Sequence, residues 1–210
     1  MGCGASTPTL PLGYEAPTPP ASPPATASPA AERPVATATP LPPTAAPWFA
    51  PGNSRLTLEA ADEMASVALR EVRERGFKDV SVCVVDDSGR TLVQKTMINC
   101  ARLPPELAHA KAMLCVGMHA SSRALRDKYA GVDGKAAKMP QLLAMQTVGA
   151  YAGQPLAPFP GGVLCRDSTG AVVGAIGISG AAADEDEHCA IKGAHAVFGL
   201  TTEPAASQLA

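Results

Sequence analysis

The chain has 210 residues, which is enough for one folded domain, and 46% of them are apolar, which is enough for a hydrophobic core. Its formal net charge is −2 and no cluster of Lys or Arg stands out, which argues against a protein that binds nucleic acid. The six cysteines are widely spaced and form no C-x-x-C pair, which argues against a zinc knuckle. This spacing, together with the lack of a secretory signal, argues against a secreted disulfide framework. The chain contains no apolar run of 18 residues, which argues against a membrane-spanning segment.

The first 55 residues form a tail that we expect to be disordered. Fourteen of the 21 prolines fall within the first 51 residues, and Ala, Thr and Ser make up most of the remainder of that stretch. Such a composition cannot bury enough apolar surface to offset the entropy lost on ordering. The aromatic pair Trp48-Phe49 interrupts it, and we expect this pair either to pack back on the domain or to dock on a partner.

The tail opens with the hexapeptide MGCGAS, which matches a lipidation signal. Gly2 and Ser6 satisfy the M-G-x-x-x-S/T pattern for N-myristoylation, and Cys3 lies where a palmitoyl chain is commonly added. One myristoyl chain binds a membrane only marginally, whereas two acyl chains hold a protein there. The pattern therefore predicts a protein held at the cytosolic face of a membrane through Gly2 and Cys3, or a cytoplasmic protein if the signal is not used.

The folded domain is expected over residues 56–200, where apolar residues recur at helical or strand spacing. Its first helix begins after Thr57, a suitable N-cap, and ends at Gly76. Turn-forming residues divide each β-rich region into two short strands, as in a hairpin. In chain order, the expected elements are a helix at 58–75, strands at 80–85 and 91–97, helices at 104–129 and 139–148, strands at 161–166 and 171–178, and a helix at 183–198.

This order of elements predicts the fold class. Two strand pairs with hairpin-length turns are separated by helices, so no parallel β-α-β unit is needed. We expect an α+β domain in which an antiparallel sheet built from two hairpins is covered by helices. Residues 201–210 are expected to be a disordered C-terminus.

The helix expected at 104–129 contains two pairs of side chains that suggest haem or metal ligation. His109 and Met113 stand four residues apart and share a face, as do Cys115 and His119. Two side chains one turn apart leave a helix in nearly the same direction, so each pair supplies only one ligand to a haem iron. A metal site is not expected from these pairs alone.

The glycine-rich stretch at 174–180 leads into the last helix but is not expected to bind phosphate. Four acidic residues at 184–187 already occupy the positive end of the helix dipole, where an anion would bind. We interpret the glycines as positions of close backbone approach and a tight exit from a strand. On the same helix, the apolar stripe predicts that His188 and His195 lie on the outer face, either solvated or at a subunit interface or the lip of a site.

Several motifs of this domain are specific enough to suggest a family. They are LAHAKA at 107–112, PGG at 160–162, and VGAIGISG at 173–180, which is followed by the acidic run and by AIKGA at 190–194. Together they resemble the GlcG/HbpS-like family, which includes the haem-degrading domain and the C-terminal domain of PduO-type proteins. The resemblance extends over nearly all of residues 56–200.

The resemblance implies an α+β domain that assembles into dimers and larger rings, and some members of the family bind haem. The His that some members use for haem on the first helix has no counterpart here, because residues 58–75 contain no histidine. The family implies a pocket formed by the second helix, the Gly-Gly turn and the last helix. Carried over to this chain, the cofactor-binding candidates are His109, Lys111, Met113, Gly161, Gly162, Glu185 and Glu187.

We therefore expect an oligomeric small-molecule-binding module, with haem or another tetrapyrrole as the best candidate ligand, tethered to a membrane by its N-terminus. One alternative is an enzyme that acts on haem or on a small organic acid or aldehyde, with Lys111 or Glu185 as the acid or base. The other alternative is a non-catalytic scaffold domain tethered to a membrane. No spacing in the sequence supplies a complete catalytic set, so no catalytic residue is assigned.

Overall fold

The computed structural model of the protein describes residues 55–132, 134 and 136–209. The predicted lipidation residues Gly2 and Cys3, the aromatic pair Trp48-Phe49 and the rest of the tail lie outside the described residues. The predictions made for the tail therefore stay predictions.

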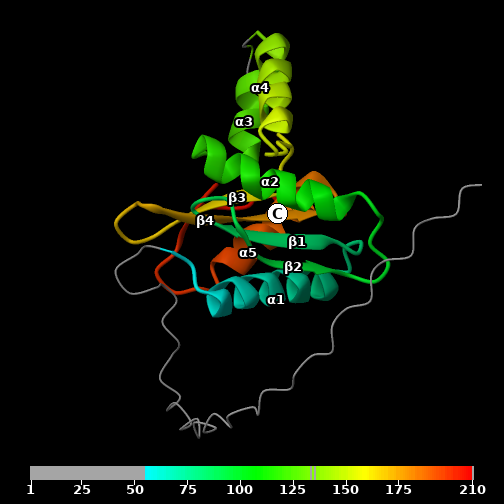
Figure 1. Ribbon diagram of the computed structural model, residues 1–210. Helices are drawn as coiled ribbons and strands as arrows, with labels where there is room; N and C mark the ends of the chain where they lie inside the picture. Colours follow the sequence, from blue (N-terminus) through cyan, green and yellow to red (C-terminus); the bar gives the residue numbers. More distant parts are fainter. Residues whose placement is uncertain (1–54, 133, 135, 210) are drawn as a thin grey trace, which may run out of the picture. The chain divides into compact units, whose positions relative to one another are not determined.

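The centre of the described domain is a five-stranded sheet in the order β2-β1-β4-β3-β5, in which all neighbours are antiparallel (Figure 1). The hairpins β1–β2 and β3–β4 supply four of these strands, and β1 pairs with β4 to join them. The predicted fold class is confirmed. The strands are β1 (Ser81–Asp86), β2 (Thr91–Thr96), β3 (Gly162–Arg166), β4 (Val172–Ser179) and β5 (Thr201–Glu203).

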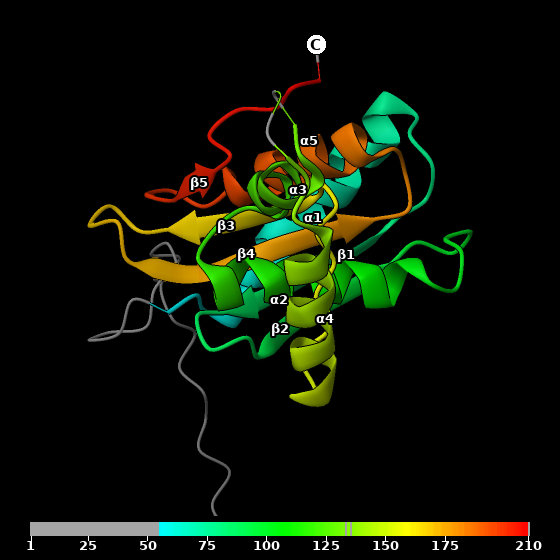
Figure 2. The same cartoon turned by 90° about the horizontal axis from the view of Figure 1, so that it is seen from above.

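Helices cover both faces of the sheet. One face packs against α2, and the opposite face packs against α5 and α1, while α3 and α4 lie beyond α2 (Figures 1 and 2). No helix in the described part of the chain is long and apolar enough to cross a membrane. The helices are α1 (Leu58–Arg75), α2 (Pro104–Met118), α3 (Ser122–Ala130), α4 (Met139–Tyr151) and α5 (Ala183–Ala194).

The central strand β1 serves both faces through alternate side chains. Val82 and Val84 belong to the cluster with α1 and α5, and Cys83 and Val85 belong to the cluster with α2. This is the period of two that a pleated strand imposes, and full burial of each valine contributes about 1.5–3 kcal/mol. The two clusters fix α2 and α5 on opposite faces of the same strands.

The backbones of α2 and the sheet approach closely at Gly177 of β4. A Cβ atom at this position would lie 2.0 Å from the carbonyl oxygen of Ala108 in α2, so only glycine fits. The interpretation of the glycine-rich stretch as a place of close backbone approach is confirmed at this residue. Because α2 lies directly on β4, Lys111, three residues after Ala108, reaches the end of β4.

The prediction of a single helix at 104–129 was wrong, because α2 and α3 are separate helices. His119, which follows α2, has a φ of +51°, in the left-handed region that ends a helix. The hydroxyl of Ser121 then accepts a hydrogen bond from the backbone N–H of Ala124 and caps α3. The chain therefore turns after α2, and α3 and α4 lie beyond α2, away from the sheet (Figure 1).

The C-terminal segment differs from the disordered C-terminus expected over residues 201–210. Thr201–Glu203 pair with the outer edge of β3, whose backbone N–H and C=O groups would otherwise be left without strand partners. Further on, the side-chain oxygen of Gln208 accepts a hydrogen bond from Arg123 in α3. The segment thus covers a sheet edge and contacts α3.

Candidate functional site

The N-terminal turns of α5 hold a group of charged side chains that we call the α5 charge cluster. The ammonium of Lys111 lies 2.9 Å from a carboxylate oxygen of Asp186 and donates a hydrogen bond to the carbonyl of Ile178 at 2.7 Å. The guanidinium of Arg123 donates to Glu187 at 2.7 Å and also contacts Asp184. The cluster consists of Lys111, Arg123, Asp184, Asp186 and Glu187, all of which except Asp184 are buried.

Burial opposes the charged state of these groups. It raises the pKa of Asp186 to about 6, against the opposing effect of the neighbouring Lys111, and it lowers the pKa of Lys111. It also raises the pKa of Glu187, whose second carboxylate oxygen has no hydrogen-bond partner among the described residues. The cluster is therefore costly to bury and depends on each of its internal contacts.

The Gly161-Gly162 turn closes over this cluster. Gly161 has a φ of +117°, and a Cβ atom there would lie 2.8 Å from the ammonium nitrogen of Lys111. The N–H of Gly162 donates to the hydroxyl of Ser122 at 2.8 Å, which holds the turn against the start of α3. Lys111 is only 3% exposed as a result. The cluster is closed in this structure, and the two glycines serve its packing.

The predicted site residues are only partly brought together. Lys111, Gly161, Gly162 and Glu187 meet at the α5 charge cluster. Glu185 lies at the outer edge, where its carboxylate accepts a hydrogen bond from the backbone N–H of Ala182 at 2.9 Å. This contact caps the start of α5 and leaves Glu185 apart from Lys111.

The other two candidates on α2 face away from Lys111. His109 lines a polar surface hollow of about 390 Å³. Met113 is buried under the β1–β2 turn, where a Cβ atom on Gly89 would lie 2.9 Å from its terminal carbon. Successive residues of a helix are rotated by about 100°, so His109 and Met113 share a face that Lys111 does not. The other residues lining the hollow are Thr91, Gln94, Pro105 and Glu106.

The prediction that His188 lies on the outer face of α5 was wrong. His188 is only 5% exposed, and its Nε2 lies 2.8 Å from a carboxylate oxygen of Glu71 in α1. This contact lowers the pKa of Glu71. Because α5 packs against α1 beside it as well as against the sheet, it buries a second side that its apolar stripe does not reveal. His195 does lie outside, with its Nε2 3.0 Å from the hydroxyl of Thr202.

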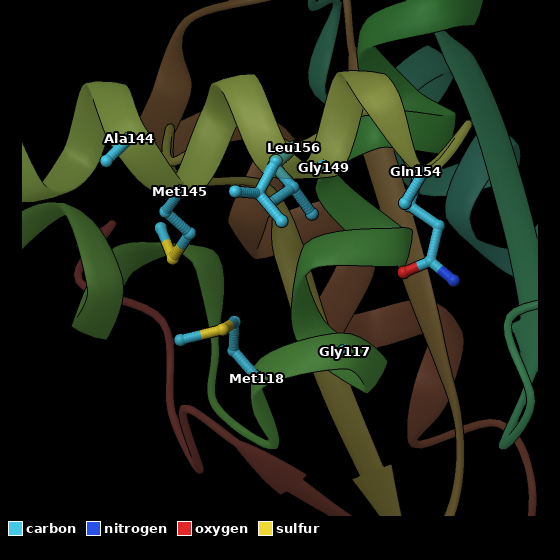
Figure 3. A pocket seen from close by; sticks show the side chains of 9 residues that line it. Gly117, Met118, Ala144, Met145, Gly149, Gln154 and Leu156 are labelled. Carbon is cyan, nitrogen blue, oxygen red and sulfur yellow. The ribbon is translucent and has the colours of Figure 1, made fainter.

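An apolar cavity of about 380 Å³ lies between the end of α2 and α4. Met118 comes from α2 and Met145 from α4, and their thioether groups face one another across the cavity (Figure 3). No charged side chain lines it, and Gln154 supplies an amide at one end. The residues that line it are Gly117, Met118, Ala144, Met145, Val148, Gly149, Ala152, Gln154 and Leu156. Sequence reasoning missed this cavity.

The thiols and acids of the described residues form no metal site. No group of three or more His, Cys, Asp or Glu side chains in this part of the chain is arranged to hold a metal ion. The five described cysteines are free, as expected from their spacing. Burial raises the pKa of Cys83 to about 11 and that of Cys165 to about 12, so these thiols are neutral and unreactive.

A family model described as "Haem degrading protein HbpS-like" matches residues 56–195. The crystal structure of HbpS superposes with a TM-score of 0.55 at 30% identity over 69% of this chain and 92% of that chain. An HbpS double mutant from Streptomyces reticuli gives the same TM-score and identity over 74% and 99%. No curated protein matches the chain at a significant level.

A more distant structure shares the fold. The crystal structure of a PduOC–haem complex superposes with a TM-score of 0.58 at 23% identity, over 71% of this chain and 99% of that chain. The Klebsiella pneumoniae protein ORFY superposes with a TM-score of 0.55 at 23% identity, over 67% and 89%. At this identity, the two likenesses show the fold.

Proposed function

The chain belongs to the HbpS-like family of haem-degrading proteins, and from this premise we propose that its folded domain is a binding module for haem or another tetrapyrrole. The observation that carries the proposal is the apolar cavity between α2 and α4. Support for haem in particular comes from the description of the family and from the fold shared with a PduOC–haem complex.

The residues of the cavity suit a haem group. Its volume of about 380 Å³ lies within the range of ligand pockets, about 300–1,000 Å³, and its apolar walls suit an apolar macrocycle. Thioether sulfur is an axial ligand in haem proteins, so Met118 and Met145 are the candidate iron ligands and Gln154 a hydrogen-bond donor at the edge. Haem, when bound, supplies a redox-active iron, and these side chains would orient it.

Hemin titration of the full-length protein tests this proposal. We expect a sharp Soret band that saturates at about one equivalent, and a loss of affinity of about tenfold or more when both Met118 and Met145 are changed to alanine. Met139→Ala removes a thioether from the same helix outside the cavity and is the matched control. A broad absorbance that does not saturate, or equal affinity in the double variant and the control, would reject the cavity as the site.

The polar hollow around His109 is the competing place for the ligand. An imidazole is the commonest axial ligand of haem iron, so a hollow that contains His109 has to be tested separately. We expect His109→Ala to keep the Soret band of the wild-type protein. A loss confined to His109→Ala would move the site to this hollow.

Assembly and tethering complete the proposed function. We propose that the domain forms a homo-oligomer and that acyl chains on Gly2 and Cys3 hold it at the cytosolic face of a membrane. Light scattering after gel filtration measures the oligomer, and a monomer would contradict it. Gly2→Ala should release the protein to the soluble fraction of its own cells, and unchanged membrane partition would contradict the lipidation signal.

An enzyme is the second candidate, because the perturbed pKa values of Lys111 and Asp186 are typical of acid–base pairs. Both groups are closed off by the Gly161-Gly162 turn, which favours a structural role. Decay of the Soret band with oxygen and a reductant would measure haem degradation. Equal decay in a Lys111→Met/Asp186→Leu double variant would show that this pair takes no part in catalysis. An intact oligomer that binds no hemin would instead support a scaffold function.

A further inference from the structure

The outer face of α4 is apolar and exposed. Only Leu142 and Gly149 of its 13 residues are buried, the smallest share of any helix in the described domain. Residues 139–165 contain no charged residue, although 17% of the whole chain is charged. Half of the ten large hydrophobic side chains that are exposed in the described domain lie in this stretch: Met139, Leu143, Val148, Tyr151 and Phe159.

Two of them, Leu143 and Tyr151, lie on the side of α4 that is turned away from Leu142 and Gly149 and from the cavity. Leu143, Thr147 and Tyr151 are spaced by four residues and form one stripe, about 150° around the helix from Leu142 and Gly149. Leu143 is 58% exposed and Tyr151 is 96% exposed. We call α3, residues 131–138 and α4 the arm, and Figure 1 shows it standing beyond α2 at the far side from α1. An apolar stripe in this position indicates a binding surface.

Charge is distributed unevenly between the arm and the rest of the chain. Residues 122–151 contain five basic and two acidic residues, and the rest of the chain contains twelve basic and seventeen acidic residues, a net charge of −5. Arg123 is buried in the α5 charge cluster, so the other charged residues of the arm carry a net charge of +2. The backbone N–H of Lys138 donates to the carbonyl of Tyr129 at 2.9 Å, which joins the ends of α3 and α4. Lys128 and Lys138 are therefore brought to the same end of the arm, the end at which α4 begins and Leu143 lies, whereas Tyr151 lies at the other end of α4.

We propose that the outer face of α4 binds an anionic lipid membrane. The apolar stripe would enter the boundary between headgroups and acyl chains, and Lys128 and Lys138 would contact anionic headgroups. A second copy of the chain fits this face less well, because two arms of net positive charge would be brought together. The inference depends neither on tetrapyrrole binding nor on acylation. It supplies a second contact where one acyl chain alone binds only marginally.

Vesicle flotation of the full-length protein, produced without acylation, tests the inference. The probe is a phosphatidylcholine vesicle with about 30% phosphatidylserine, at an ionic strength of about 0.1 M. We expect the wild-type protein to float with these vesicles and to bind about tenfold or more weakly when Leu143→Glu and Tyr151→Glu are combined. Lys128→Gln/Lys138→Gln should also weaken binding, but only to vesicles that contain phosphatidylserine.

The matched control combines Ile98→Glu and Phe198→Glu. These side chains are 95% and 87% exposed outside the arm, so the control removes comparable apolar surface and adds the same charge. It should bind vesicles like the wild-type protein. Equal binding by the control and the Leu143→Glu/Tyr151→Glu variant, or no binding by the wild-type protein, would overturn the inference.

Two further outcomes would also overturn it. Light scattering without vesicles measures the oligomer. If the wild-type protein is a dimer and the Leu143→Glu/Tyr151→Glu variant is a monomer, the outer face of α4 binds a second copy of the chain. Unchanged binding by Lys128→Gln/Lys138→Gln would remove the selection of anionic lipid. Hemin affinity, measured by the Soret band in the same variants, reports on tetrapyrrole binding separately, since Leu143 and Tyr151 do not line the cavity.

Discussion

The α5 charge cluster and the arm depart from the usual distribution of charge in opposite directions. The cluster places Lys111 and Asp186 in the interior, where charged groups are rare, and the arm leaves Leu143 and Tyr151 in water. The strong contacts of the cluster are made within the chain, whereas the outer face of α4 is open. The comparison indicates that the closed charges hold the domain together and that the open apolar surface binds something else.

The cluster connects the elements on either side of the sheet end. Lys111 on α2 and Arg123 on α3 both pair with acids of α5, which is far away in the sequence. A buried ion pair of this kind does not add much stability over an apolar pair of the same shape, but breaking it leaves a lone buried charge. Removal of one partner should therefore be far more damaging than removal of both.

The largest expected effect is that of Lys111→Met. It leaves the carboxylate of Asp186 buried without its partner, so we expect the free energy of unfolding in urea to fall by about 3–5 kcal/mol. The double variant Lys111→Met/Asp186→Leu should recover most of this loss because no charge remains. A loss of less than about 1 kcal/mol in the single variant would mean that the pair does not hold α2 to α5.

Most of the fold could be predicted from the sequence, because it depends on local signals. The hydroxyl of Thr57 accepts a hydrogen bond from Ala60, and α1 ends at Gly76, where φ is +66°, as the sequence predicted. The break between α2 and α3 was missed because it contains no glycine or proline. The readable signal was Ser121, a good N-cap in the middle of an apparently continuous helix.

The candidate site was less predictable, because it depends on contacts between distant segments. Asp186 and Glu187 were interpreted as acids at the positive end of the helix dipole, and Glu187 as a cofactor-binding candidate, but residues on α2 and α3 pair with them. Lys111 was the available signal, since it is a lone cation in the buried part of a helix. The cavity was missed because its lining comes from three segments of the chain. The uncharged sequence of α4 alone does not show which face of the helix lines a cavity.

The second expected effect is on the pH dependence of stability. Burial raises the pKa of Asp186 from 3.8 to about 6, so in this interval the folded protein holds a proton that the unfolded chain has lost. The free energy of unfolding of the wild-type protein should therefore fall by about 2–3 kcal/mol, relative to Asp186→Asn, as the pH rises from about 4 to about 6. Urea unfolding of both proteins at several pH values measures this difference.

Titration of other groups is the main source of error in that comparison. The pKa of Glu187 is also raised by burial, and those of Asp86 and Glu71 are lowered by hydrogen bonds, but these groups are present in both proteins and cancel. Parallel pH profiles for wild type and Asp186→Asn would contradict a raised pKa at Asp186. Such profiles would also mean that burial of Asp186 carries no electrostatic cost, and the α5 charge cluster would then not differ from the arm in this respect.

The smallest expected effect belongs to the arm and completes the contrast. Leu143→Gln and Tyr151→Gln change side chains that are mostly in water, so each should alter the free energy of unfolding by no more than about 0.5 kcal/mol. Thermal and urea unfolding of the two variants measure this. A loss of about 2 kcal/mol or more would mean that the stripe is already covered within the protein, for example by a second copy, since burial of such a side chain contributes about that much. If the two substitutions leave the free energy of unfolding unchanged but weaken vesicle binding, the fold does not require Leu143 and Tyr151, and these side chains serve the binding surface.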